Sequence, residues 1–559
     1  MECVPNFSEG VNLDTIQAIC REIESVTGVS LLNVDPGKAT NRTVVTFAGS
    51  PEAVVDAAFL AIKKASELID MRLHSGEHPR MGATDVCPFI PVSGVSMEDA
   101  ISCAQSLAQR VGSELNIPVF LYEEAQSNKS RSNLSVIRSG EYEGMEHKLS
   151  LPEWKPDYGP QAFNAKSGVT AIGARDFLIA YNINLNTAST RIANRIAFDV
   201  REAGRVKRDG NPYSGSVVLD EQGEPVRIPG KLKHVKAIGW YIQEYGVAQI
   251  SMNLTQFRET PVHVAFDAVC DSALSRGVRV TGSELVGLIP LKALTDAGVY
   301  FLKKQGRSTG VSDQTLIHIA VKSLGLDELG PFDPYEKIIE YKIQKPDHKA
   351  LIANTVEGFV NDTASDTPAP GGGSVAALAA ALGAALGSMV ANLSADKRGW
   401  EDRTPYFSDK AYELRSLIND FLFWIDEDTR SFNQVMDAFR LPKSTEHEQQ
   451  VRANQIQVAS IYATEVPLKV LNSAAKVLPL LESMIQEGNP NSLSDAGVGV
   501  ACIQTALIGA RMNVLINAAS LNDKKRADDF KQEANRVFME AQAKANALLK
   551  VVDQKLDAD

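Results

Sequence analysis

Residues 76–82 read GEHPRMG, which places a histidine between an acid and an arginine and a glycine at each end. A strand-like run follows at residues 85–92. The unperturbed pKa of an imidazole lies near neutrality, so His78 can accept or donate a proton at working pH. Loops on a rigid scaffold are frequent positions for reactive groups. His78 is therefore a candidate for acid–base catalysis. The alternative is a surface turn whose histidine only caps a neighbour.

Other polar residues in this half lie at the ends of strand-like runs. Asp35 follows one run, Arg42 opens the next, and Arg80 shares the loop of His78. A segment rich in glycine and small residues lets backbone N–H groups approach a flat or anionic ligand. Its ten residues are Gly159, Pro160, Gln161, Ala162, Phe163, Asn164, Ala165, Lys166, Ser167 and Gly168. The alternatives are a turn-forming aspartate, solvated arginines and a crossover that binds no ligand.

A glycine run in the second half precedes an alanine-rich stretch with no charged residue at 375–393. Gly371, Gly372 and Gly373 are expected to expose backbone N–H groups at the positive end of a helix, which suits an anionic ligand. Ser374 is predicted to be the N-cap of that helix. The alternative is a flexible linker that meets a capped helix.

Asp428 interrupts an apolar stripe, and the surrounding steps of three and four residues place it on the same helix face. The stripe consists of Leu417, Phe421, Trp424, Phe432, Val435 and Phe439. Asp426 and Glu427 are expected on other, more solvated faces. A carboxyl among aromatic residues has a raised pKa and can act as an acid or base near neutrality. The alternative is a buried aspartate hydrogen-bonded to a neighbouring helix.

Length and composition indicate a globular protein of several domains. The chain has 559 residues, 44% hydrophobic and 23% charged, which is too long for one core. A net charge of −12 argues against nucleic acid as a main partner. Six cysteines without CxxC spacing predict no disulfide framework, no metal site and a cytoplasmic location, and no secretory signal opens the sequence. Residues 375–393 have the length of a membrane span, but alanine and glycine predominate. We predict a packed helix near the centre of a bundle, and no membrane partner.

The element pattern predicts an α/β half and an all-α half. Strands and helices alternate twice, restarting near Asp176, which predicts two ferredoxin-like split βαβ sandwiches. Long helical periods follow. The predicted divisions are 1–178, 179–326, a linker at 327–349 and a helical domain at 350–559. Strands are expected at 2–7, 30–34, 42–47, 86–92, 118–122, 177–185, 235–241, 247–254 and 338–341. Helices are expected at 51–69, 97–115, 189–203, 261–276, 291–304, 409–439, 446–481, 495–520 and 525–556, with a hairpin or long loop at 208–230.

Both halves resemble known enzyme families. ECVPNFSEG (residues 2–10), GEHPRMGATDVCPFIPV (76–92), FLIAYNINL (177–185) and VGLIPLKAL (286–294) resemble glutamate formimidoyltransferase, over roughly residues 2–341. TPAPGGGSVAALAAALGAALGSMV (367–390) and AFRLPK (438–443) resemble formimidoyltetrahydrofolate cyclodeaminase, over roughly residues 350–549.

The first resemblance implies transfer of a formimino group from N-formimino-L-glutamate to N5 of tetrahydrofolate. It implies that His78 is the catalytic histidine and that residues 159–168 bind folate. We infer that Asp35 orients the imidazole, and that Arg42, Arg80, Lys166 or Arg175 pairs with the carboxylates of glutamate and folate.

The second resemblance implies closure of 5-formiminotetrahydrofolate to 5,10-methenyltetrahydrofolate with release of ammonia, and Asp428 as the acid–base group. Together the two imply histidine degradation and one-carbon metabolism, a homo-oligomer, and polyglutamylated tetrahydrofolate as co-substrate without a metal. A different hypothesis is a glutamate formyltransferase with a non-catalytic helical folate-binding or oligomerisation domain.

Overall fold

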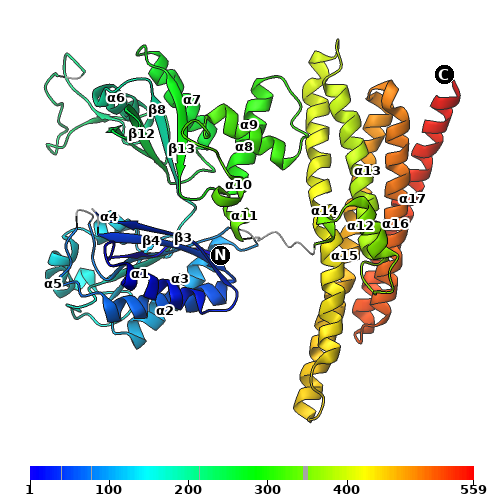
Figure 1. Ribbon diagram of the computed structural model, residues 1–559, viewed down its shortest axis with the longest axis horizontal. Helices are drawn as coiled ribbons and strands as arrows, with labels where there is room; N and C mark the ends of the chain where they lie inside the picture. Colours follow the sequence, from blue (N-terminus) through cyan, green and yellow to red (C-terminus); the bar gives the residue numbers. More distant parts are fainter. Residues whose placement is uncertain (39–40, 77–78, 93, 213, 344–349, 559) are drawn as a thin grey trace. The chain divides into compact units, whose positions relative to one another are not determined.

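The chain divides into two compact units in a computed structural model that describes residues 1–38, 41–76, 79–92, 94–212, 214–343 and 350–558. The first unit comprises Met1–Ala297 and Ala320–Lys345, and the second Gly298–Ile319 and Pro346–Asp559. Two main sheets with covering helices lie in the first unit, and long helices form the second (Figure 1). The predicted fold class, α/β followed by all-α, is confirmed.

The first sheet is a split βαβ sheet extended by two parallel strands. Its order is β3-β4-β1/β2-β5-β7-β6, and β1 and β2 are two parts of one strand separated by Val4 and Pro5. β7 runs parallel to both β5 and β6, whereas the other pairs are antiparallel. The strands are β1 (Glu2–Cys3), β2 (Asn6–Phe7), β3 (Val29–Gly37), β4 (Arg42–Gly49), β5 (Thr84–Ile90), β6 (Val119–Glu123) and β7 (Thr170–Ala174).

Three helices cover one face of this sheet: α1 (Leu13–Glu24), α2 (Pro51–Leu68) and α3 (Met97–Glu114) (Figure 1). Successive side chains of a strand point to opposite faces. Cys3, Phe47 and Phe89 accordingly lie in the core that these helices share. Glu2 and Val44 are an odd number of residues from Cys3 and Phe47 along their strands, so they line a cleft on the other face. The alternation therefore leaves one sheet face open to a ligand.

The second sheet has the plain split βαβ order, β11-β12-β8-β13, with antiparallel pairs throughout. Two helices pack against it, and a short antiparallel hairpin, β9–β10, frames much of the predicted loop at 208–230. The elements of this region are β8 (Ile179–Leu185), α6 (Thr190–Val200), β9 (Arg205–Val206), β10 (Arg227–Ile228), β11 (Val235–Ile242), β12 (Val247–Leu254), α7 (Val262–Leu274), β13 (Val280–Val286), α8 (Leu291–Lys304), α9 (Asp313–Leu324), α10 (Pro334–Lys337) and α11 (Ile339–Ile343).

One sequence expectation in the first unit was wrong, and two strands of its main sheets were missed. β7 and β13 were not predicted, because TAIGA is made mostly of small residues and VTGSELV holds a glycine next to a register shift. Residues 338–341 were predicted as a strand, because the segment begins with two β-branched residues, Ile338 and Ile339. Ile338 forms only an isolated bridge with Ile289, and α11 begins at the next residue.

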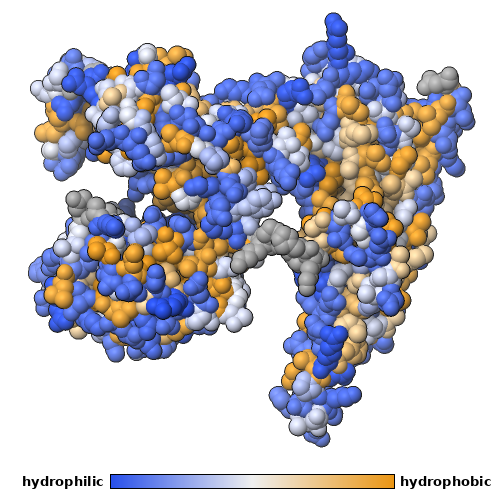
Figure 2. Space-filling model, viewed as in Figure 1, coloured by the Kyte–Doolittle hydropathy of each residue, from blue (hydrophilic) through white to orange (hydrophobic). Residues whose placement is uncertain are grey.

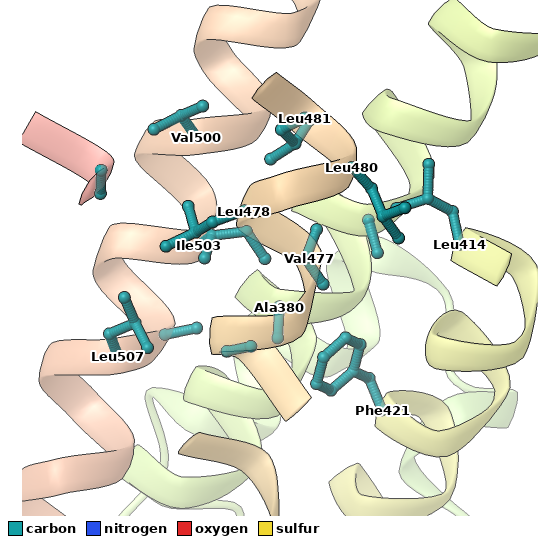
Figure 3. Close-up of a cluster of buried hydrophobic side chains, with 14 of the residues drawn as sticks. Ala380, Leu414, Phe421, Val477, Leu478, Leu480, Leu481, Val500, Ile503 and Leu507 are labelled. Carbon is teal, nitrogen blue, oxygen red and sulfur yellow. The ribbon is translucent and has the colours of Figure 1, made fainter. Parts of the chain in front are cut away.

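The second unit is a bundle of long helices around α13. Its helices are α12 (Val356–Thr363), α13 (Gly372–Ala395), α14 (Thr404–Arg440), α15 (Glu446–Glu487), α16 (Leu493–Ala519) and α17 (Lys524–Ala558). α13 packs against α14, α15 and α16, and a Cβ at Gly383 would collide with the backbone of Gly499 and with Ile503. Figure 3 shows the adjoining core, to which Leu414 of α14 and Val477 and Leu481 of α15 contribute. The predicted central packing of this helix is confirmed.

α13 and Pro490–Ala519 are long and apolar enough to cross a bilayer by length and composition. In the bundle, 61% of the most apolar stretch of α13 is buried. Its alanine- and glycine-rich composition is therefore also that of a closely packed helix.

Candidate active sites

A cleft of about 910 Å³ lies over the open face of the first sheet. Its floor comes from alternate residues of β1 to β5, and residues of the second sheet complete its wall. The floor residues are Glu2, Val4, Asn6, Asn33, Asp35, Arg42, Val44, Thr46, Val86, Pro88 and Ile90. The wall includes Ala180, Lys236, Asn253 and Val286. The structure thus places Asp35 and Arg42, two of the predicted site residues, in one cleft.

An ion-pair cluster occupies one end of this cleft. Asp85 at the start of β5 is fully buried and accepts hydrogen bonds from Arg42 Nη1 and from Arg138 Nη2, the latter at 2.7 Å. Arg42 Nε also donates to Asn6 Oδ1 at 3.0 Å. Both arginines line the cleft. Sequence reasoning missed Asp85 and Arg138, although an acid that opens an otherwise apolar strand was a usable signal for Asp85.

Glu2 lies at the opposite end, since it pairs in register with Ile90, the last residue of β5. It is 2% exposed, and its Oε2 has no hydrogen-bond partner among the described residues. Burial raises the pKa of Glu2 to about 8, although Arg175 opposes that shift. A neutral carboxyl is therefore expected near neutral pH. Sequence reasoning missed this residue as well.

The histidine loop is tied to the cleft on its C-terminal side. His78 lies outside the described residues. Three residues later, the N–H of Met81 donates to Asp85 Oδ1 at 3.0 Å. Ser8 Oγ donates to the carbonyl of Gly82 at 2.7 Å, and a Cβ at Gly82 would collide with the backbone of Val169. The end of the loop is therefore fixed beside the Arg42–Asp85–Arg138 cluster.

The C-terminal end of the predicted folate segment, residues 159–168, packs against the described C-terminal end of this loop. Gly168 has a positive φ of 68° and lies against the Met81 and Gly82 backbone. Lys166 Nζ donates to the carbonyl of Glu67 at 2.8 Å, so its amine is engaged in the fold. Among the described residues that line the cleft, none comes from this segment. Its role in binding folate stays a prediction.

Arg80 is engaged by acidic residues of the fold rather than by the cleft. Its guanidinium donates to Glu143 at 2.6 Å and to Glu141 at 3.2 Å, and it does not line the described cleft. These contacts join the histidine loop to α5 (Glu141–Ser150). They favour a structural role for Arg80 over the predicted contact with a substrate carboxylate.

A second cavity, of about 310 Å³, lies within the helical unit. Its lining brings together the glycine run at the start of α13, Asp428 of α14 and two asparagines of α16. The polar lining residues are Asp428, Thr429, Ser431, Ser460, Asn513, Asn517 and Ser520, beside Gly371, Gly372, Gly373, Phe432 and Val435. The glycine run and Asp428, far apart in sequence, thus share one site.

The predicted N-cap at Ser374 is wrong. Gly371 is the N-cap and makes no side-chain cap, and the helix already begins at Gly372. Ser374 is instead buried in the first turn, where its hydroxyl lies 2.9 Å from the carbonyl of Ile425 and 3.1 Å from Asp428 Oδ2. A Cβ at Gly373 would collide with the Asp428 carboxyl. Gly373 therefore leaves space for the Asp428 carboxyl. This glycine lies in the first turn of α13 and not in a linker before the helix.

The environment of Asp428 matches the sequence expectation, but that of Glu427 does not. Burial raises the pKa of Asp428, and hydrogen bonds from Ser374 partly oppose the shift. Glu427 was expected to be solvated and is 4% exposed, because Tyr462 of α15 packs over it and donates to Oε1 at 2.5 Å. Burial and this contact raise the pKa of Tyr462 to about 12. Asp426 is partly buried and accepts the N–H of Leu351 at 2.6 Å.

Comparison with known proteins covers both units. Residues 1–175 match the family described as formiminotransferase domain, N-terminal subdomain, residues 180–344 match formiminotransferase domain, and residues 355–536 match formiminotransferase-cyclodeaminase. The formimidoyltransferase-cyclodeaminase of Gallus gallus is 42% identical over 556 residues, which cover 99% of each chain.

Two further relatives each match one half. The glutamate formimidoyltransferase of Thermoplasma acidophilum is 42% identical over 312 residues, which cover 56% of this chain and 94% of that protein. The methenyltetrahydrofolate cyclohydrolase of Methylorubrum extorquens is 36% identical over 203 residues, which cover 36% of this chain and 98% of that protein.

Proposed function

The chain belongs to the formimidoyltransferase-cyclodeaminase family, and we propose that each of its two units carries out one of the two reactions. The first unit transfers the formimino group of N-formimino-L-glutamate to N5 of tetrahydrofolate. The second unit closes the product to 5,10-methenyltetrahydrofolate and releases ammonia. The observation that carries this proposal is the cavity in which a buried carboxyl, Asp428, meets the glycine run at the start of α13.

In the first reaction, N5 attacks the amidine carbon, the bond to the glutamate nitrogen breaks, and glutamate leaves as the amine. His78 takes the N5 proton and returns a proton to the departing nitrogen, and Asp35 orients the imidazole. Support comes from the Met81–Asp85 hydrogen bond, which holds the end of the histidine loop beside a cleft that Asp35 and Arg42 also line. Residues 159–168, whose last residue contacts Met81 and Gly82, contribute to folate binding.

In the second reaction, N10 attacks the amidine carbon and the bond to the terminal nitrogen breaks. Ammonia leaves only after protonation, so Asp428 accepts the N10 proton and passes one to the leaving nitrogen. A carboxyl with a raised pKa suits both proton transfers. The backbone of Gly371–Gly373 borders the space next to this carboxyl and binds the folate beside it.

The test follows ammonia release and methenyl absorbance together, with purified protein, tetrahydrofolate and formiminoglutamate as donor. Both signals are expected with wild type. D428N should accumulate 5-formiminotetrahydrofolate, and H78A should release no ammonia unless that intermediate is supplied. Transfer from N-formylglutamate with no ammonia release from supplied intermediate would instead support a formyltransferase with a non-catalytic helical domain.

We also propose a setting for the enzyme: histidine degradation in the cytoplasm, with polyglutamylated tetrahydrofolate as co-substrate and a homo-oligomeric assembly. Hydrophobic residues gather on the visible face of the helical unit (Figure 2). On α13 and α16, Leu382, Met512 and Ile516 are each more than half exposed, which supports packing between subunits. A mass measurement of the purified protein in solution tests the assembly.

A further inference from the structure

The two guanidinium groups at one end of the first cleft have more N–H donors than their contacts with the described residues use. Each arginine carries five N–H donors. Arg42 engages three of its own, two with Asn6 and one with Asp85. Arg138 engages one, with Asp85, and its buried Nε has no partner among the described residues. Asp35 also lines the cleft but makes no hydrogen bond to either guanidinium in the described structure. The remaining donors suit an anionic ligand.

The fold holds both arginines in place. Asp85 is fully buried and binds one N–H of each, which fixes the two guanidinium groups side by side. The turn that carries Arg138 is fixed by Lys148, whose amine donates to the carbonyls of Val136, Ile137 and Ser139 at 2.6–3.0 Å. A preorganised pair of forked donors is the usual arrangement for recognising a carboxylate.

We propose that Arg42 and Arg138 bind the α-carboxylate of the formimino donor, and that Asp85 positions them; this proposal rests on the transferase function proposed above. Tetrahydrofolate also carries carboxylates, but they lie beyond the aminobenzoyl ring, far from N5. In formiminoglutamate the α-carboxylate is attached to the carbon that bears the formimino nitrogen. Asp85 also accepts the N–H of Met81, three residues after His78, so the arginine pair lies beside the reacting end of the cleft.

The experiment pairs a change in the enzyme with a change in the donor. Full-length wild type, R138Q and R138K are assayed with formiminoglutamate and with its α-carboxamide. R138Q is expected to raise the KM for formiminoglutamate by about 10–100-fold, the loss of one charge-assisted contact, with the KM for tetrahydrofolate unchanged. Wild type should prefer the acid to the amide by at least a similar factor, and R138Q should reduce that preference, because only Arg42 then remains to bind the carboxylate. R138K should fall between them, because it keeps the charge without the fork.

R131Q is the matched control. Arg131 is 14% exposed against 15% for Arg138 and pairs with Asp157 at 2.8 Å, but it does not line the described cleft. R131Q should change neither the KM for formiminoglutamate nor the KM for tetrahydrofolate. An unchanged KM for tetrahydrofolate shows that the first unit of each variant keeps its fold, and ammonia release from supplied 5-formiminotetrahydrofolate shows that the second unit is intact. An R138Q enzyme that prefers the acid as strongly as wild type does, or that changes only the KM for tetrahydrofolate, would overturn the proposal. A wild type that transfers no formimino group would instead refute the function itself.

Discussion

At the scale of single residues, Ser374 opposes the effect of burial on the pKa of Asp428. Burial raises the pKa of the carboxyl, whereas the hydrogen bonds from Ser374 stabilise its charged form and lower it. S374A should therefore raise that pKa further. If Asp428 must be ionised to accept the N10 proton, the acid limb of the cyclodeaminase pH–rate profile moves to higher pH in S374A. An unchanged profile would show that Asp428 is not the titrating base.

The control for this prediction is S388A, which removes a buried hydroxyl from the same helix at a position that does not line the described cavity. It should leave the pH profile in place. Formimino transfer by the first unit should be unchanged in both variants, because the altered helix belongs to the other unit.

Glu2 should make the stability of the first unit depend on pH. Its pKa is about 8 in the folded chain against 4.5 ordinarily, so the folded state binds the extra proton between those values. The stability that this proton provides is complete below pH 4.5 and is lost as pH rises through about 8. Over that window the free energy of unfolding should fall by up to about 1.4 kcal/mol per pH unit more in wild type than in E2Q.

Thermal unfolding of wild type and E2Q from pH 5 to pH 8 measures this difference. Limited proteolysis identifies which unfolding transition belongs to the first unit. E2Q should gain stability relative to wild type as pH rises. Parallel pH dependences in the two proteins would mean that Glu2 is already ionised in the folded state.

At the scale of elements, alternation and helical periodicity predicted most of the structure. β12 and α8 have the predicted bounds, because each has a clear apolar period and clear ends. β7 escaped prediction because tertiary packing, rather than propensity, makes it a strand: it is wholly buried between β5 and β6. Asp428 could be found from a single break in a stripe. Arg138 could not, because only the fold brings it to Asp85, 53 residues away in sequence.

The start of α13 offers an element-scale test in two adjacent glycines. A Cβ at Gly373 would collide with the carboxyl of Asp428, whereas a Cβ at Gly372 would meet only Asn513 Nδ2 at 3.5 Å. G373A should displace Asp428 and lower ammonia release from 5-formiminotetrahydrofolate by about 10²-fold or more, the scale of a lost acid–base group. G372A should keep most of this activity and should raise helix stability by up to about 1 kcal/mol.

Cyclodeaminase rates and unfolding temperatures of the two variants provide the measurement, with formimino transfer as the internal control. Equal losses of ammonia release in G372A and G373A would argue against this account, since only one of the two added methyl groups lacks space.

At the scale of the whole molecule, the two cavities lie in separate units, so each reaction should survive loss of the other. A mixture of H78A and D428N chains tests this independence. D428N should supply 5-formiminotetrahydrofolate, and H78A should convert it to the methenyl product and ammonia. Because the intermediate must pass through solution, methenyl absorbance should appear after a lag, and the lag should shorten as the H78A concentration rises. If each variant keeps its own partial reaction but the mixture forms no methenyl product, the intermediate is not released into solution and the two reactions are not independent.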